Sequence, residues 1–261
     1  MSNAEVARGR AGRNPDGTMT LLEHLTELRR RLFISCLALA AGVGVSLVFA
    51  TRAIEWLKEP AESKVENFEL IFTQPLEYWQ TYFQVSLLMG LALAMPVILW
   101  QVMAFIGPGL TTNEKRWAYP IVLAASVMFV AGGAFAYYVE MPPALNFLLD
   151  QSGDVARPLI SVKSYVSFAT RLMFVTGLAF ETPFVVMGLA VAGVVTSKKL
   201  LGYWRFAILG AFVISAVVTP SIDPVTQTLV AGPMIVLYFV GIALAKLVER
   251  ARRRAAAASP L

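Results

Sequence analysis

The sequence predicts an all-α membrane protein with six transmembrane helices, and three observations lead to this prediction. Hydrophobic residues make up 57% of the 261 residues and charged residues only 15%, with a mean hydropathy of +0.64. Soluble domains are about 45–50% apolar and about 25% charged. The apolar residues also fall into six runs separated by polar segments, and basic residues gather in alternate segments. Lipid is therefore the expected solvent for most of the chain.

The lengths of the runs can be compared with the thickness of a bilayer. A spanning helix needs about 20 apolar residues. The first four runs are long enough, although Arg171 and Glu181 interrupt the fourth. The last two are shorter, so we expect two short helices joined by a Pro-rich turn, with local thinning of the bilayer or packing against longer neighbours. The six runs are 32–50, 83–106, 118–139, 165–195, 206–218 and 229–244.

The basic residues predict the orientation of the chain. Most of the 22 lysines and arginines stand before the first run, between the second and third, between the fourth and fifth, or after the sixth. The segment 51–82 instead carries six glutamates. The positive-inside rule therefore predicts that both termini are cytoplasmic. Residues 1–18 and 249–261 are predicted to be mobile basic tails on either side of a membrane domain at 19–248.

Enzymatic chemistry is poorly supported. The chain contains no GxxxxGK[ST], HExxH or GxSxG motif, and it has one histidine and one cysteine, Cys36, which lies inside an apolar run. We therefore expect no enzyme activity, no metal or other cofactor and no intramolecular disulfide. The net charge of +5 fits the membrane orientation better than a nucleic-acid partner. An export signal at residues 30–33 is disfavoured because the apolar run is long, no cleavage pattern follows it and five more runs come after.

Two carboxylates on the predicted cytoplasmic side are candidate binding groups. Glu27 lies in an amphipathic helix that leads into the first run, four residues before Arg31, and a surface pair of this kind contributes about 0.3–0.5 kcal/mol. Glu114 stands where the third helix begins, where an acidic side chain is favoured by the helix dipole. The alternative to these structural roles is that each carboxylate binds a guanidinium in a bidentate, charge-assisted pair. The leucines that define the amphipathic helix are Leu21, Leu25, Leu28 and Leu32.

Polar residues inside the apolar runs are candidates as well. Glu181 stands near the middle of the fourth run, just before Pro183, where burial of a charge costs about 2.5–3.5 kcal/mol. We therefore expect Glu181 to face a wet cavity or to stay protonated. Arg171 lies nearer the outer end and is expected to snorkel towards water, whereas Asp223 is expected to cap or turn the chain. Prolines in or at the ends of the runs predict bent helices and a concave bundle, and they are Pro96, Pro120, Pro183 and Pro233.

Several motifs occur in an order and spacing that resemble the TatC family over about residues 21–246. They are HLTELRRRL at 24–32, PVILWQ at 96–101, FIGPGL at 105–110 with Glu114, AFAYY at 134–138, LNFL at 145–148, SYVSF at 164–168, FETP at 180–183, and TP at 219–220 with Asp223 and Gln227. The resemblance implies a glove-like six-helix receptor. It also implies the core of a twin-arginine translocase, which exports folded proteins across a bacterial or archaeal cytoplasmic (inner) membrane using the proton-motive force.

The resemblance also implies roles for single residues. Glu27 and Glu114 match carboxylates that bind the paired arginines of a signal peptide, and the predicted signal-peptide site includes His24, Arg29, Phe105 and Leu110. Glu181 matches a carboxylate on the concave membrane-embedded surface. Pro60 and Asp223 match structural positions on the outer side. Thr219 and Gln227 match polar positions where the single-span subunits TatA and TatB dock, so we expect an oligomer with TatB.

The chain departs from the family pattern at three places, and two other functions stay open. The turn TPSID at 219–223 replaces a frequent TPPD, Lys115 replaces a common arginine, and Arg171 is not expected. The runner-up function is a proton-coupled small-solute secondary transporter with Glu181 as its proton site. Such transporters usually contain repeats, and none is visible between the halves. A purely structural scaffold is the third possibility.

Overall fold

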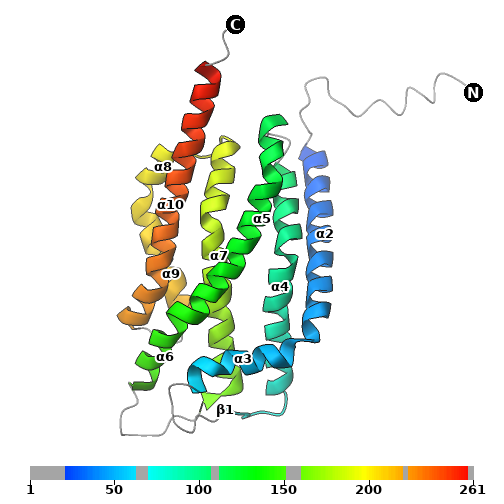
Figure 1. Ribbon diagram of the computed structural model, residues 1–261, viewed down its shortest axis with the longest axis vertical. Helices are drawn as coiled ribbons and strands as arrows, with labels where there is room; N and C mark the ends of the chain where they lie inside the picture. The colour runs from blue at the N-terminus through cyan, green and yellow to red at the C-terminus, as the bar shows by residue number, and fades with distance from the viewer. Residues whose placement is uncertain (1–20, 63–69, 107–111, 151–159, 220–222, 258–261) are drawn as a thin grey trace, which may run out of the picture.

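The computed structural model describes residues 21–62, 70–106, 112–150, 160–219 and 223–257 of the chain. Long helices stand side by side along the length of the molecule, and one of them crosses the others obliquely (Figure 1). The long elements are α2 (Leu21–Leu47), α4 (Glu77–Ile106), α5 (Thr112–Phe135), α7 (Val162–Val191), α9 (Trp204–Val218) and α10 (Pro224–Ala257). The shorter ones are α3 (Ala50–Glu62), the π-helical turn η2 (Ala136–Glu140), α6 (Met141–Asp150), α8 (Ser197–Gly202), β1 (Leu70–Ile71) and β2 (Ile160–Ser161).

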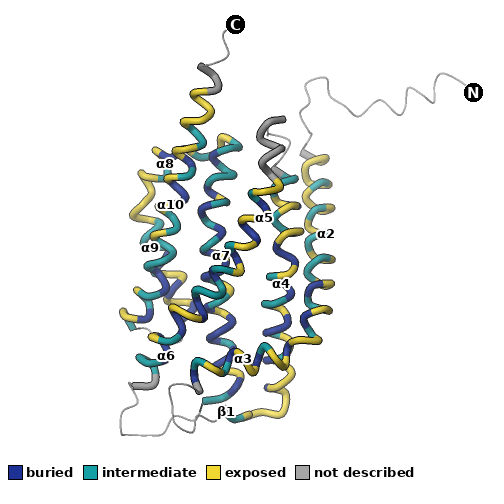
Figure 2. Tube along the Cα trace, viewed as in Figure 1, coloured by how far each residue is buried: buried dark blue, intermediate teal, exposed yellow. Residues whose placement is uncertain are grey.

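The predicted all-α membrane fold is confirmed. In the described part of the chain, five helices are long and apolar enough to cross a membrane, and Trp204–Val218 is a shorter apolar helix. Each of the six apolar runs lies in a different one of these helices. Large apolar side chains on their outer faces are exposed, as in Leu37, Leu93 and Val130. Exposed and half-exposed residues cover the outer surfaces of the helices (Figure 2), which is expected of a protein whose solvent is lipid.

The prediction of two short last helices is correct for α9 and wrong for α10. α9 has 15 residues, but α10 has 34 and continues to Ala257, through the segment predicted as a tail from residue 249. Arginine and alanine are strong helix formers, so the helix propagates beyond the apolar run. At its start, Asp223 Oδ1 accepts a hydrogen bond from the backbone N–H of Thr226 at 2.6 Å, which is the capping contact predicted for this turn.

The two ends of the bundle differ. α2 begins and α10 ends at the same end, which we call the terminal end, whereas α3 and β1 lie at the opposite end, which we call the α3 end (Figure 1). Exposed aromatic side chains occur near both. Phe72, Tyr78, Trp79 and Phe83 lie near the α3 end, and Trp100, Tyr119, Tyr203 and Trp204 lie near the terminal end. Two aromatic belts of this kind mark the levels at which a bilayer meets water.

Residues near the α3 end form the main core and fasten α3 to the bundle. Pro60 has no N–H, so it removes the helical hydrogen bond to the carbonyl of Trp56. The buried hydroxyl of Tyr137 donates to that carbonyl instead, at 2.7 Å, and its ring stacks on Trp56 at 3.9 Å between centroids. Tyr165 donates to the carbonyl of Leu57 at 2.6 Å. The position predicted to be structurally important on the outer side is therefore tied to the core by two tyrosines.

Strands β1 and β2 join the starts of two helices that are distant in sequence. They pair in parallel, with Leu70 opposite Ile160 and Ile71 opposite Ser161. As a result, Glu77 at the start of α4 accepts hydrogen bonds from the backbone N–H of Lys163 at 2.8 Å and of Thr73 at 2.6 Å. In the sequence, Glu77 is one of the six glutamates of the acidic segment 51–82, and nothing there singles it out. In the structure it is a buried carboxylate that orders the α3 end.

Glycines allow the helices to approach closely. A Cβ atom on Gly90 of α4 would lie 2.6 Å from the backbone nitrogen of Val43 in α2, and one on Gly132 would lie 2.9 Å from the Cα of Gly177 in α7. Helices in lipid gain little from the hydrophobic effect when they associate, so backbone contact at small residues supplies much of the attraction. These two contacts therefore set how closely α2 approaches α4 and how closely α5 approaches α7.

We predict that Gly90→Ala lowers the melting temperature of the detergent-solubilised protein. The added methyl group forces α2 and α4 apart, and overpacking of this kind costs about 1–3 kcal/mol. Gly44→Ala is the matched control because a Cβ there meets nothing within 4 Å, so its melting temperature should be unchanged or higher. Equal melting temperatures for the two variants would contradict the close α2–α4 contact.

We also predict that Tyr137→Phe destabilises the protein. The change leaves the Trp56 carbonyl without its donor, which costs about 1–3 kcal/mol in a buried site. Tyr138→Phe is the control, since its exposed hydroxyl makes no hydrogen bond to the residues that the structure describes. Thermal unfolding followed by circular dichroism measures the difference, and a Tyr137→Phe variant as stable as Tyr138→Phe would refute the role of this bond.

Candidate functional site

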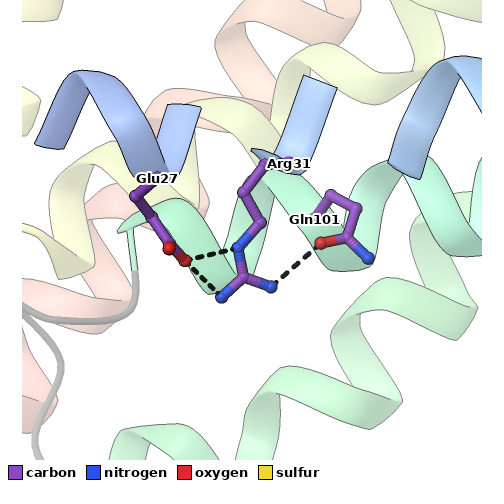
Figure 3. Close-up of polar contacts among 3 residues, drawn as sticks. All are labelled: Glu27, Arg31 and Gln101. Carbon is purple, nitrogen blue, oxygen red and sulfur yellow. Dashed lines mark hydrogen bonds and ion pairs between the residues drawn. The ribbon is translucent and has the colours of Figure 1, made fainter. Parts of the chain in front are cut away.

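Arg31 connects α2 to α4 near the terminal end. Its Nε donates to Oε1 of Glu27 at 2.7 Å, and its Nη2 lies 2.6 Å from the same oxygen. Its Nη1 donates to Oε1 of Gln101 on α4 at 2.9 Å. The guanidinium therefore lies between a carboxylate on its own helix and an amide from the neighbouring one (Figure 3). The predicted pair between Glu27 and Arg31 is confirmed, whereas Gln101 was not singled out as a partner.

This pair is accessible and weakly held. The side chains of Arg31 and Glu27 are 28% and 24% exposed. Helical ion pairs at i,i+4 contribute about 0.3–0.5 kcal/mol, because water screens the charges and two long side chains lose freedom. Oε2 of Glu27 accepts no hydrogen bond from any residue in the described ranges. The carboxylate can therefore accept a hydrogen bond from another donor, or bind that donor in place of Arg31, with a small loss of free energy.

An aromatic contact lies next to this pair. His24, three residues before Glu27 on α2, stacks on Phe105, four residues after Gln101 on α4, with 4.4 Å between ring centroids and 26° between ring planes. Helical spacing places His24, Glu27 and Arg31 on one side of α2. We call these three residues together with Gln101 and Phe105 the α2–α4 patch. It combines a carboxylate, a guanidinium, an amide and an aromatic stack on one partly exposed surface.

The other residues of the predicted signal-peptide site are not all part of this patch. Arg29 is exposed, and it makes no hydrogen bond or ion pair with any described residue. Leu110 lies outside the described residues. Glu114 is the third residue of α5, and its side chain also lies outside them. α5 begins at the terminal end, as α2 does (Figure 1). Because the side chain of Glu114 is not described, the prediction that Glu27 and Glu114 act together stays a prediction.

Two carboxylates are buried in the spanning helices. Glu181 on α7 is 4% exposed, and neither of its oxygens has a hydrogen-bond partner within the described residues. Glu140 is 1% exposed, and its Oε2 accepts from the hydroxyl of Thr176 at 2.7 Å. Glu140 was missed because the third apolar run was predicted to end at residue 139, directly before it. The π-helical turn Ala136–Glu140 and α6 continue the helix, and this continuation keeps Glu140 inside the bundle.

Thr219 and Gln227 lie at the junction of α9 and α10. The buried Thr219 hydroxyl donates to the carbonyl of Ser215 at 2.9 Å, and the Ser215 hydroxyl donates to the carbonyl of Gln227 at 2.8 Å. The first bond lies within the last turn of α9, and the second joins α9 to α10 near the turn. The outer face of α9 carries a stripe of exposed apolar side chains, formed by Phe206, Leu209, Val213 and Val217. A surface of this kind contacts lipid or the apolar face of another helix.

A protein metal site needs several ligating side chains that converge on one point. In the described ranges, no group of three or more histidine, cysteine, aspartate or glutamate side chains is arranged to hold a metal ion.

Comparison with known proteins identifies the family. The family model "Sec-independent protein translocase protein (TatC)" matches residues 23–233. A TatC protein of Synechocystis is 40% identical over 251 residues, which cover 96% of this chain and 97% of that protein. The Aquifex aeolicus TatC is 40% identical over 237 residues, covering 90% of this chain and 98% of that protein.

A solved structure agrees with the sequence matches. The crystal structure described as the twin-arginine translocase receptor TatC superimposes with a TM-score of 0.79 and 39% sequence identity. The match covers 87% of this chain and 100% of that one. The six apolar helices and the match over residues 23–233 together place this chain in the TatC family of Sec-independent protein translocase proteins.

Proposed function

We propose that this chain is the receptor and core component of a twin-arginine translocase, which binds the twin-arginine signal peptides of folded cargo and exports that cargo using the proton-motive force. The observation that carries the proposal is the guanidinium of Arg31 on the carboxylate of Glu27. Within this chain, Arg31 occupies the position that a signal-peptide arginine would take. The carboxylate is therefore already placed for the ligand that the proposal requires.

The geometry suggests how recognition proceeds. A peptide arginine replaces Arg31 on Glu27, or shares the carboxylate through Oε2, and little energy is lost because the internal pair is weak. The stacked rings of His24 and Phe105 offer an adjacent face for cation–π contact. Glu114, at the start of α5, takes the second arginine. Lysine is a poorer ligand because an ammonium cannot reproduce the planar fork of a guanidinium.

We also propose how the chain is oriented in the membrane and which subunits it contacts. Both termini lie in the cytoplasm of a bacterial or archaeal cell, and the α3 end faces outward, as the distribution of lysine and arginine favours. The exposed apolar stripe of α9 supports docking of the single-span subunits TatA and TatB, with Thr219 and Gln227 close to the contact. Glu181 is the buried carboxylate that we assign to the concave membrane surface, where the apolar part of the signal passes.

The signal-peptide site is tested by binding measurements. We predict that Glu27→Gln or Glu114→Gln weakens binding of a fluorescent twin-arginine peptide at least about tenfold, the loss expected for one charge-assisted hydrogen-bond pair. Fluorescence anisotropy with the protein in nanodiscs measures the dissociation constants. Glu55→Gln, an exposed change on α3 at the other end, is the control. Unchanged affinity and unchanged export of a twin-arginine reporter in the first two variants would refute the receptor proposal.

We further predict that Arg31→Gln strengthens binding of the same peptide about twofold. Removal of the internal competitor recovers the roughly 0.3–0.5 kcal/mol of the helical ion pair. Arg30→Gln is the matched control, because it removes the same charge from an exposed neighbouring position. If Arg31→Gln instead weakens binding as much as Glu27→Gln does, Arg31 belongs to the site and is not a competitor.

A further inference from the structure

A polar cavity lies at the α3 end, far from the α2–α4 patch. It has a volume of about 430 Å³ and is lined by the first turns of α7 and by the segment before α4. Its walls carry two cations, Lys163 and Arg171, together with the hydroxyls of Ser164, Ser167 and Thr73. A cavity with two cations and several hydroxyl groups matches the chemistry of a phosphate ester.

An apolar groove adjoins this cavity on the membrane side. It has a volume of about 380 Å³ and is lined by leucines of α2 and α4 and by Phe174 of α7. Arg171 lines both spaces. A polar chain also connects them, because Ser167 donates to Gln84 Oε1 at 3.0 Å and Gln84 Nε2 donates to Thr170 at 2.7 Å. The cavity and the groove therefore adjoin at Arg171, with a cationic polar space on one side and an apolar space on the other.

Among the residues that the structure describes, the two cations have no counter-ion. Arg171 and Lys163 are exposed, and their side chains form no hydrogen bond or ion pair with the part of the chain that the structure describes. The carboxylate beside the cavity, Glu77, is 1% exposed, and four donors already occupy it: the backbone N–H groups of Thr73, Gln74 and Lys163 and the Thr73 hydroxyl. An anion for Arg171 and Lys163 must therefore come from outside these residues.

The depth of the cavity matches the headgroup layer. The exposed aromatic residues Tyr78, Trp79 and Phe83 lie on the first turns of α4, and aromatic residues of this kind sit where headgroups meet the acyl chains. Gln74, just before these turns, and Ser164, in the first turn of α7, line the cavity at this level. The groove then runs along α4 and α7 past Leu91 and Phe174, towards the middle of the membrane.

We propose that this cavity and groove bind an anionic phospholipid of the leaflet at the α3 end. Its phosphate lies between Lys163 and Arg171, and one acyl chain lies in the groove. Charge complementarity favours this occupant over an apolar peptide helix, which would leave the two cations without partners. The adjoining apolar groove favours it over a free phosphate, which would leave the apolar surface empty. The inference concerns the opposite end of the bundle from the α2–α4 patch, so it is independent of signal-peptide binding.

Native mass spectrometry of the full chain in a neutral detergent tests the proposal. Dioleoyl phosphatidylglycerol should bind about tenfold or more tightly than dioleoyl phosphatidylcholine, as expected for charge-assisted contacts to an anionic headgroup. The double variant Lys163→Gln/Arg171→Gln should lose this preference. Arg52→Gln/Lys58→Gln, which removes two charges from α3 at the same end, should retain it. Arg171→Lys should recover part of the preference if the charge is what the lipid recognises.

The groove is tested separately. Leu88→Trp should weaken binding of dioleoyl phosphatidylglycerol, because it fills the groove, and should leave the short-chain dihexanoyl lipid unaffected. Three results would overturn the proposal: equal affinity of the unmodified chain for the two dioleoyl lipids, displacement of the lipid by inorganic phosphate at the same concentration, or displacement by the apolar part of a signal peptide. Melting temperatures of all variants show whether each one is folded.

Discussion

The fold depends on one constraint, which is that polar groups buried inside the bundle find no water and must be satisfied within the chain. The α3 end meets this constraint with long-range hydrogen bonds. Tyr137 replaces the hydrogen bond that Pro60 removes from Trp56, and Glu77 gathers four donors from two segments. Such bonds cost more to break than equivalent bonds at a water-exposed surface, since an orphaned group has no alternative partner. They explain why a short helix with a proline inside it is held firmly against the bundle.

Polar groups that are not satisfied within the chain are the candidates for binding a ligand. In the described ranges, the side chains of Glu181, Arg171 and Lys163 have no hydrogen-bond or ion-pair partner. The α2–α4 patch is different, because Glu27 is satisfied by a weak contact that another guanidinium can replace. The proposed signal site thus lies at the terminal end and the proposed lipid site at the α3 end. The close contact of Gly90 with Val43 holds α2 against α4, and residues of both helices form the α2–α4 patch and line the apolar groove.

Local periodicity explains what sequence reasoning predicted well. Each of the six predicted apolar runs lies in a helix of its own. Glu27 pairs with Arg31 because a residue and its fourth neighbour share one face of any α-helix. The same reasoning failed for α10, where the basic end was expected to be a tail although arginine and alanine favour helix. It also ended the third span one residue before Glu140, because a π-helical turn and the continuation into α6 have no clear signature in composition.

The sequence alone determined the solvent of this protein, the order of its spanning helices and the pairing of groups one helical turn apart, since these follow from hydrophobicity and from the geometry of a single helix. Only the tertiary structure decided that Gln101 shares Arg31 with Glu27, that His24 stacks on Phe105, and that Arg171 joins a polar cavity to an apolar groove. Each of these contacts joins residues far apart in the chain. Their formation depends on which faces of two helices meet and in what register, and close backbone packing sets both.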